Sequence, residues 1–253
     1  MPRVRSLTGV TSRLVVLLAF LAPAMAAAAD TILQSGPARV ALVELFTSEG
    51  CSSCPPAERW LAERRTDAGL WREFVPVAWH VTYWDNLGWP DRLAQRVFTD
   101  RQYAYAAAWR RESVYTPCFV RDGREWRPDQ GGAAGAAAGM LRADFEPQTG
   151  ALQVEFQPAA PDGAALELDA ALLGGGLVSE VRAGENSGRR LEHEFTVLAT
   201  VRAPLVREAA GFHATLRLPL PAGAPAPRRA LAVWITRRGE LTPLQAAGGW
   251  LGP

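Results

Sequence analysis

The sequence predicts an α/β domain followed by a β-rich, sandwich-like domain. Between residues 39 and 81, two short apolar runs flank a segment with helical spacing, which is the pattern of a strand, a helix and a strand. After residue 140 the chain changes to short alternating runs separated by Gly, Pro and Asn, as in antiparallel sheets. We therefore expect one domain over residues 30–139 and a second over residues 140–253.

Composition places the chain among globular proteins. It has 253 residues, of which 48% are hydrophobic and 21% charged, so it can bury a large core. Its formal net charge of +1 excludes a strongly basic nucleic-acid binder, and we expect no nucleic-acid partner. Three cysteines are too few for a disulfide framework.

Residues 1–29 have the pattern of a cleaved secretory signal peptide. An arginine-containing start is followed by an apolar run at 14–22 and by alanines that offer small-x-small cleavage patterns. Pro23 interrupts the run, which is shorter than the roughly 20 apolar residues of a membrane anchor. We expect a periplasmic or secreted protein without a stable membrane span after processing, in a compartment where disulfides persist.

The predicted α/β domain contains one strand–helix–strand unit and a later hairpin. Pro55 and Pro56 suit the first turn of the helix, and a crossover helix would make the two strands parallel. Asp122-Gly123 is a strong hairpin signal. The expected elements are strands at 39–46 and 74–81, a helix over 57–70, one or two helices over 91–109, and a hairpin from 114 to 127.

Six short runs define the predicted β-rich domain. Turn-forming Gly, Pro and Asn residues separate them, and no repeat of fixed period is visible. The runs cover residues 152–156, 166–172, 178–181, 191–201, 212–218 and 231–236.

Cys51 and Cys54 form a C-x-x-C at the predicted junction between strand and helix. Because a helix N-terminus favours negative charge, we expect the pKa of Cys51 to be lowered. A Cys51 thiolate would attack a disulfide, and Cys54 would then resolve the mixed disulfide. An inert bridge and a bound metal are the alternatives, although a lone C-x-x-C is weak support for structural zinc.

Two further features resemble the active site of thioredoxin-like folds, which makes the predicted α/β domain thioredoxin-like. In those folds a Thr-Pro pair with a cis bond lies against the C-x-x-C, which implies that Thr116 and Pro117 orient a substrate backbone. Glu44 resembles the buried acid that accepts a proton in thioredoxins. We expect it to lie near Cys54 with a raised pKa.

Four residues are accessory candidates. Cys118 is a third thiol, a metal ligand or a small buried strand residue. His80 ends the second strand and is either structural or a base or ligand. Trp84 and Asp85 belong to an aromatic segment that forms either core packing or one wall of a substrate groove, and Asp85 would cap a turn or tune charge near the cysteines.

Four longer blocks resemble the family of secreted bacterial proteins grouped as domain of unknown function 1223. They are VELFTSEGCSSCPP at 43–56, HVTYWDNLGW at 80–89, FTDRQYAYAAA at 98–108 with VYTP at 114–117, and RAGENSGRRLEH at 182–193. The resemblance implies a thioredoxin-like N-terminal part, and it makes Glu185, Arg189 and His193 candidates for a polar site or for packing against the first domain. The sequence departs from the family at Cys118, where Gln is common, and at Thr82, where Asp is usual.

Together these features predict an exported thiol–disulfide oxidoreductase that acts on protein or peptide disulfides and works with a redox partner protein. The predicted chemistry uses no cofactor and no metal. Two alternatives stay open. One is a non-catalytic binding module with a structural disulfide. The other is a carrier of copper or another soft metal on Cys51, Cys54 and Cys118, with His80 as a further ligand, because thiolates suit Cu(I).

Overall fold

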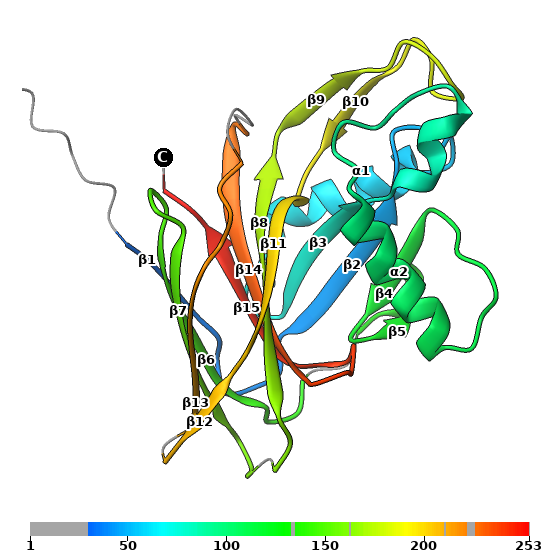
Figure 1. The fold of residues 1–253 in the computed structure, drawn as a ribbon. Helices are drawn as coiled ribbons and strands as arrows, with labels where there is room; N and C mark the ends of the chain where they lie inside the picture. Colours follow the sequence, from blue (N-terminus) through cyan, green and yellow to red (C-terminus); the bar gives the residue numbers. More distant parts are fainter. Residues whose placement is uncertain (1–29, 133–134, 162, 210, 222–225, 253) are drawn as a thin grey trace, which may run out of the picture.

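Strands dominate the structure, a computed structural model that describes residues 30–132, 135–161, 163–209, 211–221 and 226–252. The predicted signal peptide at 1–29 lies outside these residues. The described residues form fifteen strands, two α-helices and three short 3-10 helices. The strands make an eight-stranded sheet, a five-stranded sheet and a two-stranded ribbon (Figure 1).

The eight-stranded sheet runs across the whole molecule. Its strands, in spatial order, are β15 (Pro243–Trp250), β14 (Arg228–Arg237), β8 (Leu166–Gly175), β11 (Thr196–Pro204), β3 (Phe74–His80), β2 (Ala41–Thr47), β4 (Cys118–Arg121) and β5 (Arg124–Glu125). The five-stranded sheet contains β1 (Thr31–Gln34), β6 (Gly139–Glu146), β7 (Ala151–Pro158), β13 (Gly211–Arg217) and β12 (Val206–Glu208). The ribbon consists of β9 (Leu177–Glu180) and β10 (Arg190–His193).

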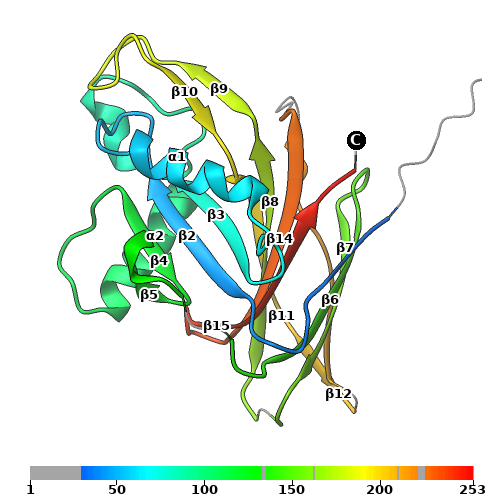
Figure 2. The same cartoon turned by 180° about the vertical axis from the view of Figure 1, so that it is seen from behind.

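Two α-helices accompany the β2–β3 end of the large sheet. Helix α1 (Pro55–Glu63) and helix α2 (Arg96–Ala108) lie on opposite faces of this end (Figures 1 and 2). The 3-10 helices are η1 (Arg64–Thr66), η2 (Thr82–Leu87) and η3 (Pro128–Gln130).

The predicted strand–helix–strand unit is confirmed as a local element. Strands β2 and β3 are parallel, with Leu42 opposite Val75, and α1 connects them. Pro55 opens the helix, as its fixed φ allows. The helix ends at Glu63 and not at residue 70, because the chain tightens into η1. The predicted hairpin is present as β4 and β5.

The predicted fold class, an α/β thioredoxin-like domain beside a separate β-rich, sandwich-like domain, is wrong. Strand β11 pairs in parallel with β3, where Thr196 lies opposite Ala78, so strands from both predicted segments share one sheet. The rest of the sheet on that side is antiparallel. The chain is predominantly β. Residues 139 and 140, the predicted boundary, are the first residues of β6.

The wrong prediction has a physical cause in β8 and β14. Alternate residues of β8 enter different cores, since Ala171 and Leu173 pack with α1, α2, β2 and β3, whereas Ala170 and Leu172 pack between the two large sheets. Strand β14 likewise sends alternate side chains into the two cores, and its Trp234 belongs to the core that contains the helices. A strand buried on both faces is a continuous apolar run, and periodicity does not tell which strands it pairs with.

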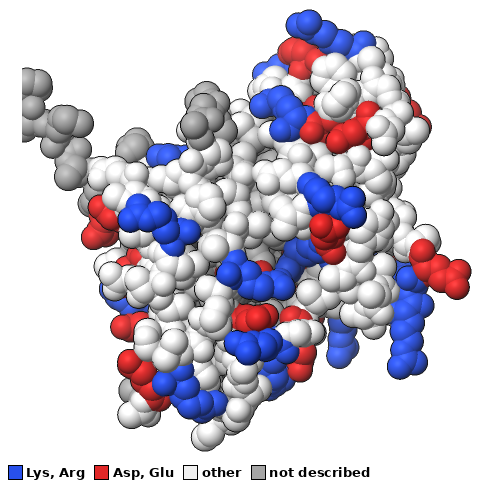
Figure 3. Space-filling view, in the orientation of Figure 1, with Lys and Arg blue, Asp and Glu red and all other residues white. Residues whose placement is uncertain are grey.

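The surface carries mixed charge. Figure 3 shows arginine and acidic side chains interspersed on one face, without a continuous area of either sign. Within the described ranges, no helix combines the length and the apolar character needed to cross a membrane.

Candidate functional site

A disulfide joins Cys51, in the loop after β2, to Cys54, which caps the N-terminus of α1. The two Cα atoms are 5.4 Å apart. Both cysteines are fully buried, whereas Ser52 and Ser53 between them are exposed. The Ser53 hydroxyl oxygen lies 3.4 Å from the Cys51 sulfur. The two serines between the cysteines are therefore exposed to solvent, whereas the cysteines are not.

The hairpin tip, residues 181–189 between β9 and β10, packs on this loop. The buried side chain of Asn186 donates hydrogen bonds to the carbonyl oxygens of Glu49 (2.9 Å) and Cys51 (2.8 Å). The carboxylate of Glu185 accepts a hydrogen bond from the backbone N–H of Ser52 at 3.1 Å. Arg189 donates to Asn186 within the tip. The tip thus holds the backbone on both sides of Cys51.

Trp84 connects the cysteine loop to the Thr116–Pro117 pair. Its indole N–H donates to the Thr116 hydroxyl at 2.8 Å. A Cβ atom built at Gly50 would lie 3.0 Å from the Cβ of Trp84, so this glycine allows the close approach. The Thr116–Pro117 peptide bond is cis. The structure therefore links the loop that carries Cys51 to Thr116, and so to the cis-proline Pro117, through Trp84.

Glu44 is buried on the face of the sheet that α2 covers. Its carboxylate accepts hydrogen bonds from Arg101 (2.6 Å), Trp79 (2.9 Å) and Tyr105. Thr47, three residues later in β2, points to the opposite face and bonds a residue of α1. Since Cys54 is the N-cap of α1, the sheet separates Glu44 from Cys54, and the Glu44 carboxylate is paired with Arg101. We therefore give Glu44 a structural role in place of proton transfer.

Cys118 is a free thiol on the same face as Glu44. It lies directly opposite Phe46 in the β2–β4 pair, and Phe46 packs edge-on against Tyr105 of α2. Burial raises the pKa of Cys118 to about 11. Because Cys118 faces α2, the structure does not gather it with Cys54 into one thiolate site.

His80 belongs to a buried group that we call the imidazole–carboxylate cluster, made up of Glu49, Glu58, His80, Asp91 and His193. His80 Nδ1 lies 2.6 Å from the Asp91 carboxylate, and His193 Nδ1 lies 2.6 Å from that of Glu58. His193 Nε2 is 3.4 Å from Glu49. The two imidazole rings meet edge to face with centroids 5.0 Å apart.

Electrostatic pairing keeps the cluster charged despite its burial. Burial by itself would raise the pKa of Asp91, but the facing His80 lowers that pKa to about 2. Burial likewise opposes ionisation of Glu58 and Glu49, and their interactions with His193 lower both pKa values. Burial would lower the pKa of His193, yet the Glu58 and Glu49 carboxylates raise it to about 10.

Sequence reasoning missed most of this cluster. Glu58 and Asp91 lie in segments without a distinguishing local pattern, and His193 appeared only through the family resemblance. The useful signal was the small number of histidines, since the whole chain has three and two of them meet in this cluster. Asp85 sits at the edge of the cluster, where it accepts the Asp91 backbone N–H at 3.0 Å. Burial and the charges of Asp91 and Glu49 raise the pKa of Asp85.

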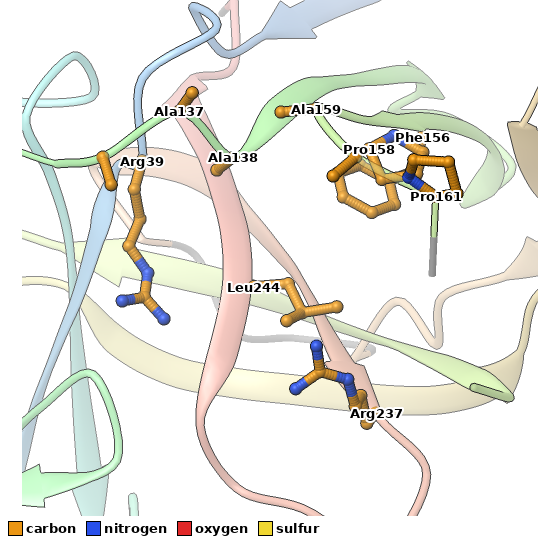
Figure 4. Close-up of a pocket in the computed structure, with 11 residues that line it drawn as sticks. Arg39, Ala137, Ala138, Phe156, Pro158, Ala159, Pro161, Arg237 and Leu244 are labelled. Atoms are coloured by element: carbon orange, nitrogen blue, oxygen red, sulfur yellow. The ribbon is translucent and has the colours of Figure 1, made fainter. Parts of the chain in front are cut away.

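A separate pocket opens at the other end of β2. Arg39, which precedes that strand, and Arg237 of β14 reach toward it beside Leu244 and Phe156 (Figure 4). Arg39 already donates to the Pro243 carbonyl oxygen. The pocket lies away from the cysteines, and we assign it no part in their chemistry.

Comparison with known proteins gives one family and two similar folds. The family model described as "Protein of unknown function (DUF1223)" matches residues 42–236. The crystal structure of protein AGR_C_4864 from Agrobacterium tumefaciens is 23% identical with a TM-score of 0.56, over 84% of this chain and 94% of that chain. HBP35 of Porphyromonas gingivalis is 15% identical with a TM-score of 0.62, over 86% and 76%. These likenesses show the fold alone. No curated protein matches the sequence.

The buried ion pair predicts a large loss of stability for Arg101→Met. The substitution leaves the Glu44 carboxylate buried without its cation, which should lower the free energy of unfolding by about 3–5 kcal/mol in urea titrations. Arg96→Met, an exposed position of the same helix, should change it by less than about 0.5 kcal/mol. The double variant Glu44→Gln/Arg101→Met should recover much of the loss. A cost below about 1 kcal/mol for Arg101→Met would contradict the buried pair.

The raised pKa of Cys118 predicts slow alkylation at neutral pH. With a pKa of about 11 the thiol stays protonated at neutral pH. Its rate of labelling by iodoacetamide should therefore keep rising with pH well above 8.5, which is about the pKa of a free thiol. The folded state keeps this proton up to a higher pH than the unfolded state does. The free energy of unfolding should therefore fall as the pH rises from about 8.5 to about 11. Peptide mass spectrometry after quenching measures the labelling. Fast labelling of folded protein at pH 7 would refute the burial of this thiol.

Proposed function

This chain belongs to the DUF1223 family, and we propose that it is an exported thiol–disulfide oxidoreductase that acts on protein or peptide disulfides through Cys51 and Cys54. The observation that carries the proposal is the Cys51–Cys54 disulfide at the start of α1, with the Thr116–Pro117 pair beside its loop. Export to the periplasm or the medium is proposed from the signal-peptide pattern of residues 1–29.

The exchange reaction needs only the two cysteines and a substrate disulfide. In the reducing direction, the Cys51 thiolate attacks one substrate sulfur, which forms a mixed disulfide and releases the other substrate sulfur as a thiolate that takes up a proton. The Cys54 thiolate then attacks Cys51, which closes the Cys51–Cys54 disulfide and releases the second substrate thiol. The protein loses two electrons and the substrate gains them. A redox partner protein returns the dithiol by the same steps in reverse.

The surroundings of the disulfide favour the reducing direction. The N-terminus of α1 attracts negative charge, which would stabilise the Cys51 thiolate. Pro55 and Pro56, however, have no N–H groups to donate in the first turn, and the buried carboxylates of Glu49 and Glu58 flank the C-x-x-C in sequence. A less stabilised thiolate means a less stable dithiol and a lower reduction potential. We expect a potential nearer about −270 mV than −120 mV.

Substrate access requires movement of the hairpin tip. Cys51 and Cys54 are fully buried, and the tip holds the loop through Asn186 and Glu185. Lifting the tip breaks three hydrogen bonds but leaves β9 and β10 paired, so opening is a local event.

Burial of both cysteines also supports a second candidate, a binding module whose disulfide is a structural staple. Structural disulfides have potentials below about −300 mV and resist the glutathione pool. The reduction potential therefore separates the two candidates.

Activity should depend on Cys51 and Cys54 and not on Cys118. In a disulfide-exchange assay with a peptide disulfide, we expect Cys51→Ala to abolish turnover. Cys54→Ala should trap a mixed disulfide with the substrate, visible by mass spectrometry. Cys118→Ala is the matched control and should keep the activity, because its thiol faces α2. Full activity of Cys51→Ala, or a potential well below about −300 mV, would refute the proposal.

Loosening the hairpin tip should expose the disulfide. Asn186→Ala removes the hydrogen bond that Asn186 accepts from Arg189 and the two that it donates to the cysteine loop. The two to the loop are worth about 1–2 kcal/mol in total, so reduction by dithiothreitol should become roughly 5- to 30-fold faster. Ser187→Ala is the control, because this exposed hydroxyl bonds only the Arg182 carbonyl oxygen within the tip. Samples quenched in acid at successive times are alkylated, and mass spectrometry of the peptide that contains Cys51 and Cys54 gives the rate of reduction. Equal rates for the parent and Asn186→Ala would show that the tip does not control access.

A further inference from the structure

The imidazole–carboxylate cluster gathers metal-ligating side chains from three distant segments. Glu58 comes from α1, His80 ends β3 and His193 ends β10, and one donor atom from each lies within 4.8 Å of the other two. All three residues are buried. We propose that Glu58, His80 and His193 bind a divalent transition-metal ion, with Zn²⁺ as the ion that such imidazole and carboxylate donors suit.

The histidine environment is that of metal-ligating imidazoles. His80 faces the Asp91 carboxylate with Nδ1 at 2.6 Å, so a carboxylate holds one ring nitrogen while the other, Nε2, faces away from it, as in histidines that bind metal ions. That Nε2 atom is fully buried and has no hydrogen-bond partner in the described part of the chain, whereas Nε2 of His193 lies 3.4 Å from Glu49. A buried unpaired polar atom is costly, and an ion bound to Nε2 of His80 would satisfy it.

The charge of the cluster is compatible with a divalent cation. The cluster contains three carboxylates, those of Glu49, Glu58 and Asp91, and their ion pairs among the described residues are with the two histidines. Even if both imidazoles carried a proton, the cluster would retain one net negative charge in a buried place. A divalent cation bound to neutral imidazoles supplies the same positive charge as two protons, and it also gives Nε2 of His80 a partner.

The donor chemistry and the burial indicate a structural ion. The donors are nitrogen and oxygen, which suit Zn²⁺ better than Cu(I), and neither Cys51 nor Cys54 belongs to the set. Glu49 Oε1 lies 3.4 Å from His193 Nε2, about the spacing of two ligands on a tetrahedral zinc ion. The ion would tie α1 and β3 to the β9–β10 ribbon. Because the donors are buried, it would enter as the chain folds.

Metal content after refolding tests this site. The full chain is unfolded in denaturant with a chelator, refolded with or without Zn²⁺ and desalted, and zinc is measured by mass spectrometry. We expect about one zinc per chain and a higher unfolding temperature with zinc than without it. Cobalt-refolded protein should show visible ligand-field bands without sulfur-to-cobalt charge transfer, a readout that needs no variant.

Matched variants locate the ion. His80→Gln and His193→Gln should lose the zinc, and Asp91→Asn, which weakens the hold on Nδ1 of His80 without removing one of the three ligands, should weaken zinc affinity about 10–100-fold. His213→Gln is the control, because this part-exposed third histidine pairs with Glu208 outside the cluster.

Three results would overturn the site. They are a wild-type chain without zinc after refolding, an equal loss in His213→Gln, and a loss in Cys51→Ser/Cys54→Ser. The last variant should keep its zinc while losing disulfide exchange, so failure of the metal site and failure of the proposed function are distinguishable.

Discussion

Burial of β8 and β14 on both faces is the constraint on which the rest of the structure depends. Each strand sends alternate side chains into two cores, one with the helices and one between the large sheets. Neither half of the chain can cover both faces alone. The five-stranded sheet covers one face, and the β2–β3 end with its helices completes the other through the parallel pairing of β3 with β11.

Two buried polar groups lie on opposite faces of the β2–β3 end, and each draws on distant segments. On the α2 face, Arg101 pairs with Glu44 and stacks over Trp234 of β14. On the α1 face, His193 of β10 meets His80 of β3. Removing one member of either group leaves a buried charge or polar atom without its partner, so both groups fix which segments meet at this end of the sheet.

The position of the disulfide joins its chemistry to the same architecture. The β9–β10 ribbon extends from β8 and β11, and its tip closes over Cys51 through Asn186 (Figure 1). His193 at the other end of the ribbon contacts Glu58 of α1, four residues after Cys54. The ribbon therefore touches both the loop before α1 and the helix itself.

The sequence by itself determined the local elements around the cysteines. Strand β2, the start of α1 at Pro55, strand β3 and the hairpin turn at Asp122-Gly123 follow from short-range apolar patterns and turn chemistry, and the structure confirms them. The family resemblance indicated Trp84 and Thr116 in part, because both residues lie in the sequence blocks that match the family, and the structure places them in hydrogen-bond contact.

Only the tertiary structure decided which strands join and which face each polar side chain meets. Glu44 and Thr47 lie three residues apart on one strand, yet the alternation of the strand sends one to Arg101 and the other to Glu58. Local pattern reports that a residue is buried, whereas its partner depends on pairings such as β3 with β11 between segments far apart in the chain. Such pairings leave no periodic trace in either segment, and for that reason the fold class and the imidazole–carboxylate cluster escaped prediction.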